Sequence, residues 1–141
     1  GAVVGLAATV RTNKREIAAD DFFTGMFETA LERDEIVTAV HFPRPEKAAY
    51  MKFPNPASRY AVVGVFVART SGAVRVAVTG AGPTVFRWRE AETALGSNFA
   101  PGAIDGLTVA AGNLNSDIHA SAEYRANLVK VMAKRAVEAA G

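Results

Sequence analysis

The fold is decided by one stretch, Tyr60-Ala61-Val62-Val63-Gly64-Val65-Phe66-Val67-Ala68-Arg69, which is apolar at nearly every position. A run that is apolar on both faces is typical of a central strand covered on both sides. Thr70-Ser71-Gly72-Ala73 suits a hairpin turn, and Val74–Thr79 alternates with its valines on one face. The stretch therefore predicts an antiparallel β-meander, with Thr84–Trp88 as a third strand.

Two segments before this stretch also have strand character. Tyr50–Phe53 is a short apolar strand, and Glu35–Phe42 alternates between two faces. Pro43-Arg44-Pro45 ends the second of these, because a proline cannot donate a hydrogen bond to a strand ladder. This proline pair is the best candidate for a domain boundary.

The first 25 residues predict two strands and a turn. Ala2–Val10 is apolar and β-branched enough for a strand, and Arg15-Glu16-Ile17 can return as a second one. Ala19–Gly25 has the character of a capped turn or a single helical turn, where an aspartate can accept hydrogen bonds from free amides. The chain has no initiator Met and opens in an apolar run, so we expect it to be a piece of a longer polypeptide.

The remainder of the chain predicts helices. Arg89–Leu95 is a short helical segment, and Pro101 suits the start of a helix that runs toward Gly112. Ser121 is a suitable N-cap for a last, amphipathic helix over Ala122–Ala139. Strands followed by helices are typical of an α+β fold. We therefore expect an antiparallel meander of three to four strands with two to three helices packed on one face.

Composition excludes several classes of function. The 141 residues contain no cysteine, which excludes disulfides, thiolate metal sites and a cysteine nucleophile within the chain. Sixteen basic and fourteen acidic residues leave a net charge of +2, which is weak evidence for binding to nucleic acid. The longest uncharged apolar stretch, Ala61–Ala68, is too short to span a bilayer.

Candidate catalytic and metal-binding residues form no convincing pattern. His41 and His119 lie far apart in sequence and lack the spacing of metal ligands. Asp20-Asp21 and Asp34-Glu35 suit helix caps and solvated edges better than an acid–base pair. We therefore expect neither a catalytic residue nor a metal site in this chain.

A glycine pair after the second strand of the meander allows two interpretations. Gly80-Ala81-Gly82 could cradle a pyrophosphate, as the glycine-rich loops of dinucleotide-binding proteins do. However, Pro83 removes an amide, and Val85 stands where the third glycine of such a loop should be. A plain turn is the simpler interpretation.

Two basic features also leave alternatives open. The last helix is basic at four positions: Arg125, Lys130, Lys134 and Arg135. These predict a solvated face, with nucleic-acid binding as the alternative. Lys52 lies in an apolar stretch, with Tyr50 on its own face. Its side chain either snorkels to solvent or directs its ammonium at a bound anion or an electron-rich ring.

Several segments, taken in order, resemble one protein family. They are IAADDFFTG at residues 17–25, Asp34-Glu35-Ile36-Val37, Phe42-Pro43, Tyr50-Met51-Lys52-Phe53, SRYAVVGV at residues 58–65, and Tyr124-Arg125-Ala126-Asn127-Leu128 with Lys134-Arg135-Ala136. The ordered set resembles the FAD-binding medium subunit of molybdenum hydroxylases, the group that includes aerobic carbon monoxide dehydrogenase and xanthine dehydrogenase. The similarity extends along nearly the whole chain.

The resemblance implies a division of the chain. Residues 1–43 are similar to the last part of the FAD-binding domain, and residues 44–141 to the C-terminal α+β domain of the same subunit. In that family the two glycine-rich loops that hold the FAD diphosphate lie before this segment. The resemblance therefore implies FAD in the full-length subunit, and an inactive fragment without measurable FAD affinity.

Three positions match residues that contact the flavin in the resembling proteins. Val37, in Asp-Glu-Ile-Val, matches a position whose backbone and side chain touch the flavin. Lys52, in Tyr-Met-Lys-Phe, matches a lysine that contacts it. Tyr60 matches a position near the isoalloxazine ring. We expect all three to be cofactor-binding residues.

The resemblance also implies partners. In the resembling enzymes a molybdopterin centre on a large subunit oxidises the substrate, and [2Fe–2S] clusters on a small subunit carry electrons to the flavin. NAD, oxygen or a quinone is the acceptor. It implies a cytoplasmic enzyme, or one attached peripherally to the inner face of the membrane. A non-catalytic α+β module that only packs against other subunits is the alternative, and an RNA-binding sheet is a third interpretation.

Overall fold

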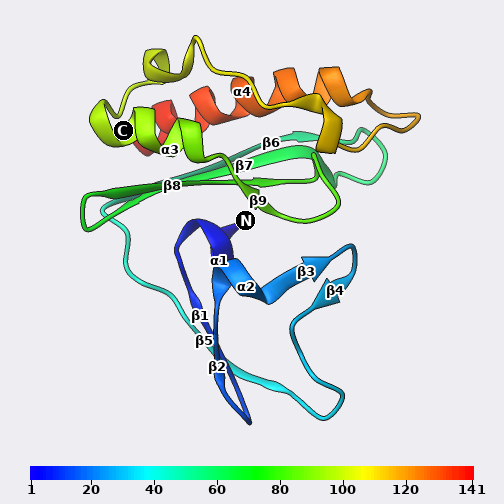
Figure 1. Ribbon diagram of the computed structural model, residues 1–141. Helices are drawn as coiled ribbons and strands as arrows, with labels where there is room; N and C mark the ends of the chain where they lie inside the picture. The colour runs from blue at the N-terminus through cyan, green and yellow to red at the C-terminus, as the bar shows by residue number, and fades with distance from the viewer.

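The structure, a computed structural model, describes all 141 residues and consists of two units (Figure 1). Residues 1–45 form the N-terminal unit, and residues 46–141 form the sheet unit. The N-terminal unit lies under one face of the larger sheet, and the helices of the sheet unit cover the other face. The central sheet is therefore covered on both sides, as its sequence predicts.

The sheet unit is built on a four-stranded antiparallel sheet with the order β6-β7-β8-β9. Its strands are β6 (Lys47–Pro54), β7 (Ala61–Thr70), β8 (Ala73–Thr79) and β9 (Phe86–Arg87). Ser71 and Gly72 both have positive φ, +50° and +80°, which is the conformation that a tight two-residue hairpin turn requires. The predicted meander is confirmed, including the inward positions of Val74, Val76 and Val78.

Two helices and two 3-10 turns cover one face of this sheet (Figure 1). They are α3 (Arg89–Ser97), η1 (Pro101–Ile104), η2 (Ala111–Asn113) and α4 (Ala122–Ala140). Ser121 caps α4 by accepting a hydrogen bond from the Tyr124 N–H at 3.2 Å, as predicted. The α+β class and the packing of helices on one face are confirmed.

The helix expected from Pro101 to Gly112 is wrong. Two separate 3-10 turns, η1 and η2, take its place, and Ile104 at the end of η1 is completely buried in the core. The two glycines at 102 and 106 weaken a longer helix, because glycine loses the most backbone entropy on folding. Burial of Ile104 therefore decides the path of this segment instead of helical periodicity.

The N-terminal unit contains short elements only. They are α1 (Ala2–Gly5), β1 (Thr9–Thr12), β2 (Glu16–Ala18), α2 (Ala19–Phe22), β3 (Phe23–Gly25), β4 (Glu28–Thr29) and β5 (Val37–His41). The strands form one sheet of order β2-β1-β5 and one hairpin, β3-β4. Of the two interpretations of Ala19–Gly25, the single helical turn forms, as α2, and no aspartate side chain caps it.

The strand predicted over Ala2–Val10 is wrong in its first half. Ala2–Gly5 forms α1, and only the end of the stretch enters β1. A Cβ on Gly5 would lie 2.4 Å from the Phe66 ring, so glycine lets α1 lie directly on the larger sheet. This tertiary contact overrides the strand propensity of the valines.

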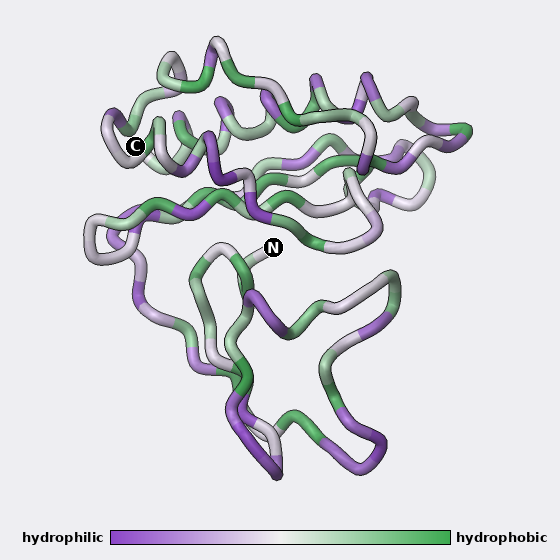
Figure 2. Tube along the Cα trace, viewed as in Figure 1, coloured by the Kyte–Doolittle hydropathy of each residue, from purple (hydrophilic) through white to green (hydrophobic).

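The two units differ in how apolar residues are distributed. Figure 2 shows hydrophobic residues gathered along the sheet and the inner side of α4, whereas the loops at the far end of the N-terminal unit are hydrophilic. A cluster of nineteen buried residues fills the space between the sheet and the helices. None of the helices combines the length and the hydrophobicity that a bilayer crossing requires.

Candidate functional site

Lys52 and Tyr60 come together at one end of the β6–β7 hairpin. Lys52 lies on β6 opposite Gly64 of β7. Its ammonium donates a hydrogen bond of 3.0 Å to the backbone carbonyl of Arg59, the residue just before Tyr60. Two of its three N–H donors have no protein acceptor. The exposed side chain therefore braces the loop and still presents a positive charge.

The loop between β6 and β7 has a defined shape. The Asn55 side chain accepts hydrogen bonds from the N–H groups of Ala57 and Ser58, and the Asn55 N–H donates to the carbonyl of Tyr60 at 2.7 Å. Arg59 has a φ of +64°, a left-handed conformation that is uncommon for a residue with a side chain. The backbone of Tyr60 is thus held, while its ring is 79% exposed. Such a ring can cover one face of a planar ligand by stacking.

The Lys52 side chain lies on the sheet face that turns toward the N-terminal unit. Tyr50 shares that face, because side chains alternate along a strand. A Cβ on Gly64 would lie 2.2 Å from the Tyr50 hydroxyl, so the close approach of this ring requires glycine. A Cβ on Gly1, at the start of α1, would lie 3.9 Å from the same ring. Lys52 and Tyr50, called the Lys52 patch below, therefore lie on the sheet face beside the junction of the two units.

Val37 lies apart from these two residues. It is the first residue of β5, pairs with Thr12 of β1 and is 37% exposed. Figure 1 shows β5 in the N-terminal unit, far from the end of the β6–β7 hairpin. The structure therefore brings Lys52 and Tyr60 together but does not bring Val37 to them.

A buried polar network lies next to Val37. The Glu35 carboxylate accepts hydrogen bonds from the Thr12 hydroxyl at 2.7 Å, from the Arg15 guanidinium at 2.9 and 3.0 Å, and from the Glu32 N–H at 2.9 Å. The bond from Arg15, followed by that from Glu32, lowers the pKa of Glu35 to about 2. The expectation of a solvated edge was therefore wrong for Glu35, which ties its loop to β1.

Asp20 links the two units by ion pairs. Its carboxylate accepts hydrogen bonds from Arg75 of β8 and, at 2.9 Å, from Arg87 of β9. Arg87 also binds Glu92 of α3 through two bonds of 2.8 and 2.6 Å. The expectation of a cap or solvated edge was wrong for Asp20, because its carboxylate pairs with two arginines of the larger sheet. Asp21 beside it is exposed, as expected.

Arg125, predicted to lie on a solvated face of the last helix, is instead buried. Its side chain is 4% exposed and donates to the carbonyls of Val62 at 2.6 Å and Gly80 at 3.1 Å, and to the Asp117 carboxylate at 2.7 Å. Arg125 precedes Leu128 by three positions, so it lies on the apolar stripe of the helix. That spacing was the signal that could have revealed its burial.

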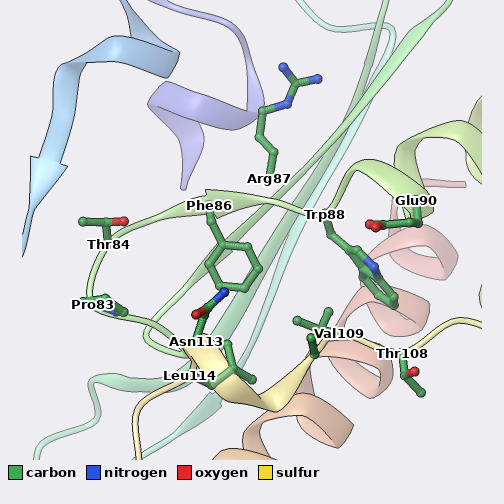
Figure 3. A pocket seen from close by; sticks show the side chains of 11 residues that line it. Pro83, Thr84, Phe86, Arg87, Trp88, Glu90, Thr108, Val109, Asn113 and Leu114 are labelled. Atoms are coloured by element: carbon green, nitrogen blue, oxygen red, sulfur yellow. The ribbon is translucent and has the colours of Figure 1, made fainter.

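A cavity of about 360 Å³ lies elsewhere in the sheet unit (Figure 3). Phe86, Trp88, Val109 and Leu114 form its apolar lining, and the Arg87 side chain points away from it toward α2. None of the predicted site residues lines this cavity. Nowhere in the chain do three His, Asp or Glu side chains come close enough together to hold a metal ion.

Comparison with protein families accounts for nearly the whole chain. Residues 48–140 match the model of the CO dehydrogenase flavoprotein C-terminal domain, and residues 1–45 match that of the FAD binding domain in molybdopterin dehydrogenase. The chain belongs to the CO dehydrogenase flavoprotein family. The resemblance drawn from the ordered segments is thereby confirmed, and the chain is flavoprotein-subunit sequence of the molybdenum hydroxylase group.

Characterised members of the flavoprotein family align with most of the chain. The medium subunit of nicotine 6-hydroxylase from Paenarthrobacter nicotinovorans is 38% identical over 138 residues, which are 91% of this chain and 49% of that protein. The medium chain of carbon monoxide dehydrogenase from Hydrogenophaga pseudoflava is 30% identical over 139 residues, 90% of this chain and 48% of that protein. The chain thus spans about half the length of the curated relatives it matches.

Solved structures support the same fold. The reconstituted CO dehydrogenase from Oligotropha carboxidovorans superposes with a TM-score of 0.80 at 28% identity, over 99% of this chain and 54% of that one. Quinoline 2-oxidoreductase from Pseudomonas putida 86 superposes with a TM-score of 0.77 over 98% of this chain and 53% of that one. Its 24% identity supports the architecture alone.

Proposed function

We propose that this chain forms one wall of a flavin site in the full-length flavoprotein subunit. In this proposal Lys52 and Tyr60 contact the isoalloxazine part of FAD from the sheet unit, and Val37 contacts the cofactor from the N-terminal unit. The observation that carries the proposal is an exposed aromatic residue, Tyr60, in the loop that is held by an ammonium with two free donors.

The residues at this junction fit a flavin. FAD, when bound, supplies the redox chemistry that side chains lack. The Lys52 ammonium would favour the reduced form, which carries more negative charge on its pyrimidine edge. The Tyr60 ring would stack on one face and exclude water from it. The bond from Lys52 to the Arg59 carbonyl would couple the lysine contact to the tyrosine contact, because it holds the loop that carries Tyr60.

The wider role follows from membership of the flavoprotein family. We propose that residues 1–43 are the last part of the FAD-binding domain and that residues 44–141 are its C-terminal α+β partner. The full subunit would take electrons from [2Fe–2S] clusters on a small subunit and pass them to NAD, oxygen or a quinone. A large subunit with molybdopterin would oxidise the substrate. This chain by itself would be inactive and would not retain FAD.

The experiment that tests this proposal compares the full-length subunit with the present chain. After addition of FAD and removal of the excess, the full-length subunit should show the visible absorption bands of oxidised flavin, and this chain should show none. A colourless full-length subunit would contradict the proposal. Tight one-to-one FAD binding by this chain in calorimetry would contradict the proposal that the chain by itself does not retain FAD.

A second candidate function is a non-catalytic module that packs against other subunits. Its supporting observation is the tip of the β3–β4 hairpin, where Phe27 is fully exposed at a φ of +61° and Met26 is 54% exposed. Exposed aromatic side chains of this kind are enriched at protein interfaces. A full-length subunit that binds partner subunits but no flavin would favour this candidate.

A further inference from the structure

Arg125 occupies the fork where two strands of the sheet separate. The pairing of β7 with β8 ends at Gly64 and Thr79. Beyond that pair the Arg125 guanidinium donates to the carbonyl of Val62 in β7 and to that of Gly80, the residue just after β8. A guanidinium has five donors in a rigid plane, so one side chain can hold two backbone segments at a set separation.

The backbone at the fork admits little change. Gly80 has a φ of +75°, and a Cβ at this position would lie 2.4 Å from the carbonyl oxygen of Ala61. The chain after β8 therefore passes directly over the first residues of β7. Arg125, which belongs to α4, holds these two backbone segments from the face of the sheet that the helices cover.

Arg125 also holds a third segment. Its second terminal nitrogen donates to the Asp117 carboxylate, which in turn accepts hydrogen bonds from the N–H groups of His119 and Ala120. These bonds lower the pKa of Asp117, chiefly through the His119 N–H. The loop before α4 is thus joined to the same fork, and a polar hollow of about 230 Å³ opens between this loop and Tyr60.

The fork lies two residues from Tyr60. On one side of Tyr60, the Asn55 turn and the Lys52 ammonium hold the preceding loop. On the other side the chain enters β7, and Arg125 binds the second residue of that strand. Tyr60 is 79% exposed, so the placement of its ring depends chiefly on these two backbone anchors.

We propose that Arg125 is a positioning residue that sets the place of the Tyr60 ring, and with it the Lys52 contact, through the carbonyl of Val62. The inference rests on the proposed flavin site but concerns a residue that does not touch the cofactor. It assigns a functional purpose to a buried arginine on the helix face of the sheet, opposite the Lys52 patch.

The test uses three variants in the full-length subunit and in the present chain. Arg125→Lys keeps the charge but cannot hold two carbonyls and a carboxylate in one plane. Asp117→Asn weakens the bond from Arg125 to residue 117 and keeps the two bonds to the carbonyls. This variant serves if Arg125→Lys does not fold. Lys134→Ala is the matched control, because it removes a basic residue of α4 that binds Asp105 at 2.6 Å, away from the fork.

The first readout needs no flavin. In the present chain, hydrogen exchange of the amides of residues 60–64 and 80–82 should become about tenfold faster in Arg125→Lys and less so in Asp117→Asn, as loss of charge-assisted hydrogen bonds predicts. Exchange in α3 should stay unchanged, and Lys134→Ala should leave the fork unchanged. Equal acceleration throughout the sheet unit, or none at the fork, would overturn the inference.

The second readout is the flavin itself. In the full-length subunit, Arg125→Lys should increase the fluorescence of bound FAD severalfold, because a displaced tyrosine ring no longer quenches it by stacking. Unchanged fluorescence of FAD bound to Arg125→Lys would overturn the inference. Failure of the wild-type subunit to bind FAD would instead refute the proposed function, and the exchange experiment would still decide whether Arg125 holds the fork.

Discussion

The sheet unit and the N-terminal unit differ sharply in how they are held together. The sheet unit has a core cluster of nineteen buried residues between its sheet and its helices. The N-terminal unit has a cluster of three, which are Val10, Ile17 and Phe22. Apolar burial is the dominant favourable contribution to folding, so the sheet unit should be far more stable.

Polar contacts compensate for the small core of the N-terminal unit. Glu35 ties the loop of residues 32–35 to β1, and Asp20 ties α2 to two arginines of the larger sheet. The exposure of all five residues of β5 also shows how little apolar packing this unit has. The comparison teaches that its structure depends on its neighbour, which is consistent with a flavin site at the junction of two units.

The largest effect should come from the core of the sheet unit. Leu95 is completely buried, and Leu95→Ala should lower the free energy of unfolding by about 2–5 kcal/mol through a cavity. Trp88 is the single tryptophan and lies in this unit, so urea denaturation followed by its fluorescence measures the effect directly. Ile17→Ala in the N-terminal unit should leave that transition nearly unchanged. Equal shifts from the two variants would contradict the difference between the units.

A smaller effect should come from the link between the units. Asp20→Asn leaves Arg75 and Arg87 without their shared carboxylate and should cost about 1–2 kcal/mol, because these contacts are only partly buried. Hydrogen exchange should accelerate in α1 and α2 while the core of the sheet unit stays protected. Asp21→Asn, which removes the same charge from an exposed neighbour, is the control and should change neither region.

The smallest effect should appear in acid. The pKa of Glu35 is lowered to about 2 from an ordinary value of 4.5, so its contribution to stability is fully present above pH 4.5 and is lost as the pH falls toward 2. Thermal melts followed in the N-terminal unit should therefore fall by a few degrees across this range. Glu35→Gln should melt earlier at pH 6 and lose this part of the pH dependence. Glu16→Gln, at an exposed position, should behave as the wild type does.

The sequence predicted the sheet unit well because its signals are local. Alternating valines, a glycine in the hairpin turn and a serine before the last helix each act within a few residues, and each prediction is confirmed. The strand predicted at Ala2 failed because a contact with Phe66, more than sixty positions away, decides that conformation. Periodicity within a segment contains no information on such a contact.

Charged residues were harder to place for the same reason. Asp20, Glu35 and Arg125 were expected to be solvated, yet all three bind partners that are distant in sequence. Only Arg125 had a local signal, its position on the apolar stripe of α4. Of the candidate site, Lys52 and Tyr60 are brought together by the β6–β7 hairpin and Val37 lies apart from them. The cofactor-binding roles of all three residues stay predictions.

The most direct test of the proposed contact between Lys52 and the flavin is the reduction potential of FAD in the full-length subunit with Lys52→Ala. Loss of a cation near the reduced flavin should lower the potential by roughly 30–100 mV. Lys47→Ala removes the same charge from the opposite face of the same strand, where the side chain lies over Phe99, and should leave the potential unchanged. An unchanged potential in Lys52→Ala, or equal shifts in both variants, would contradict the account.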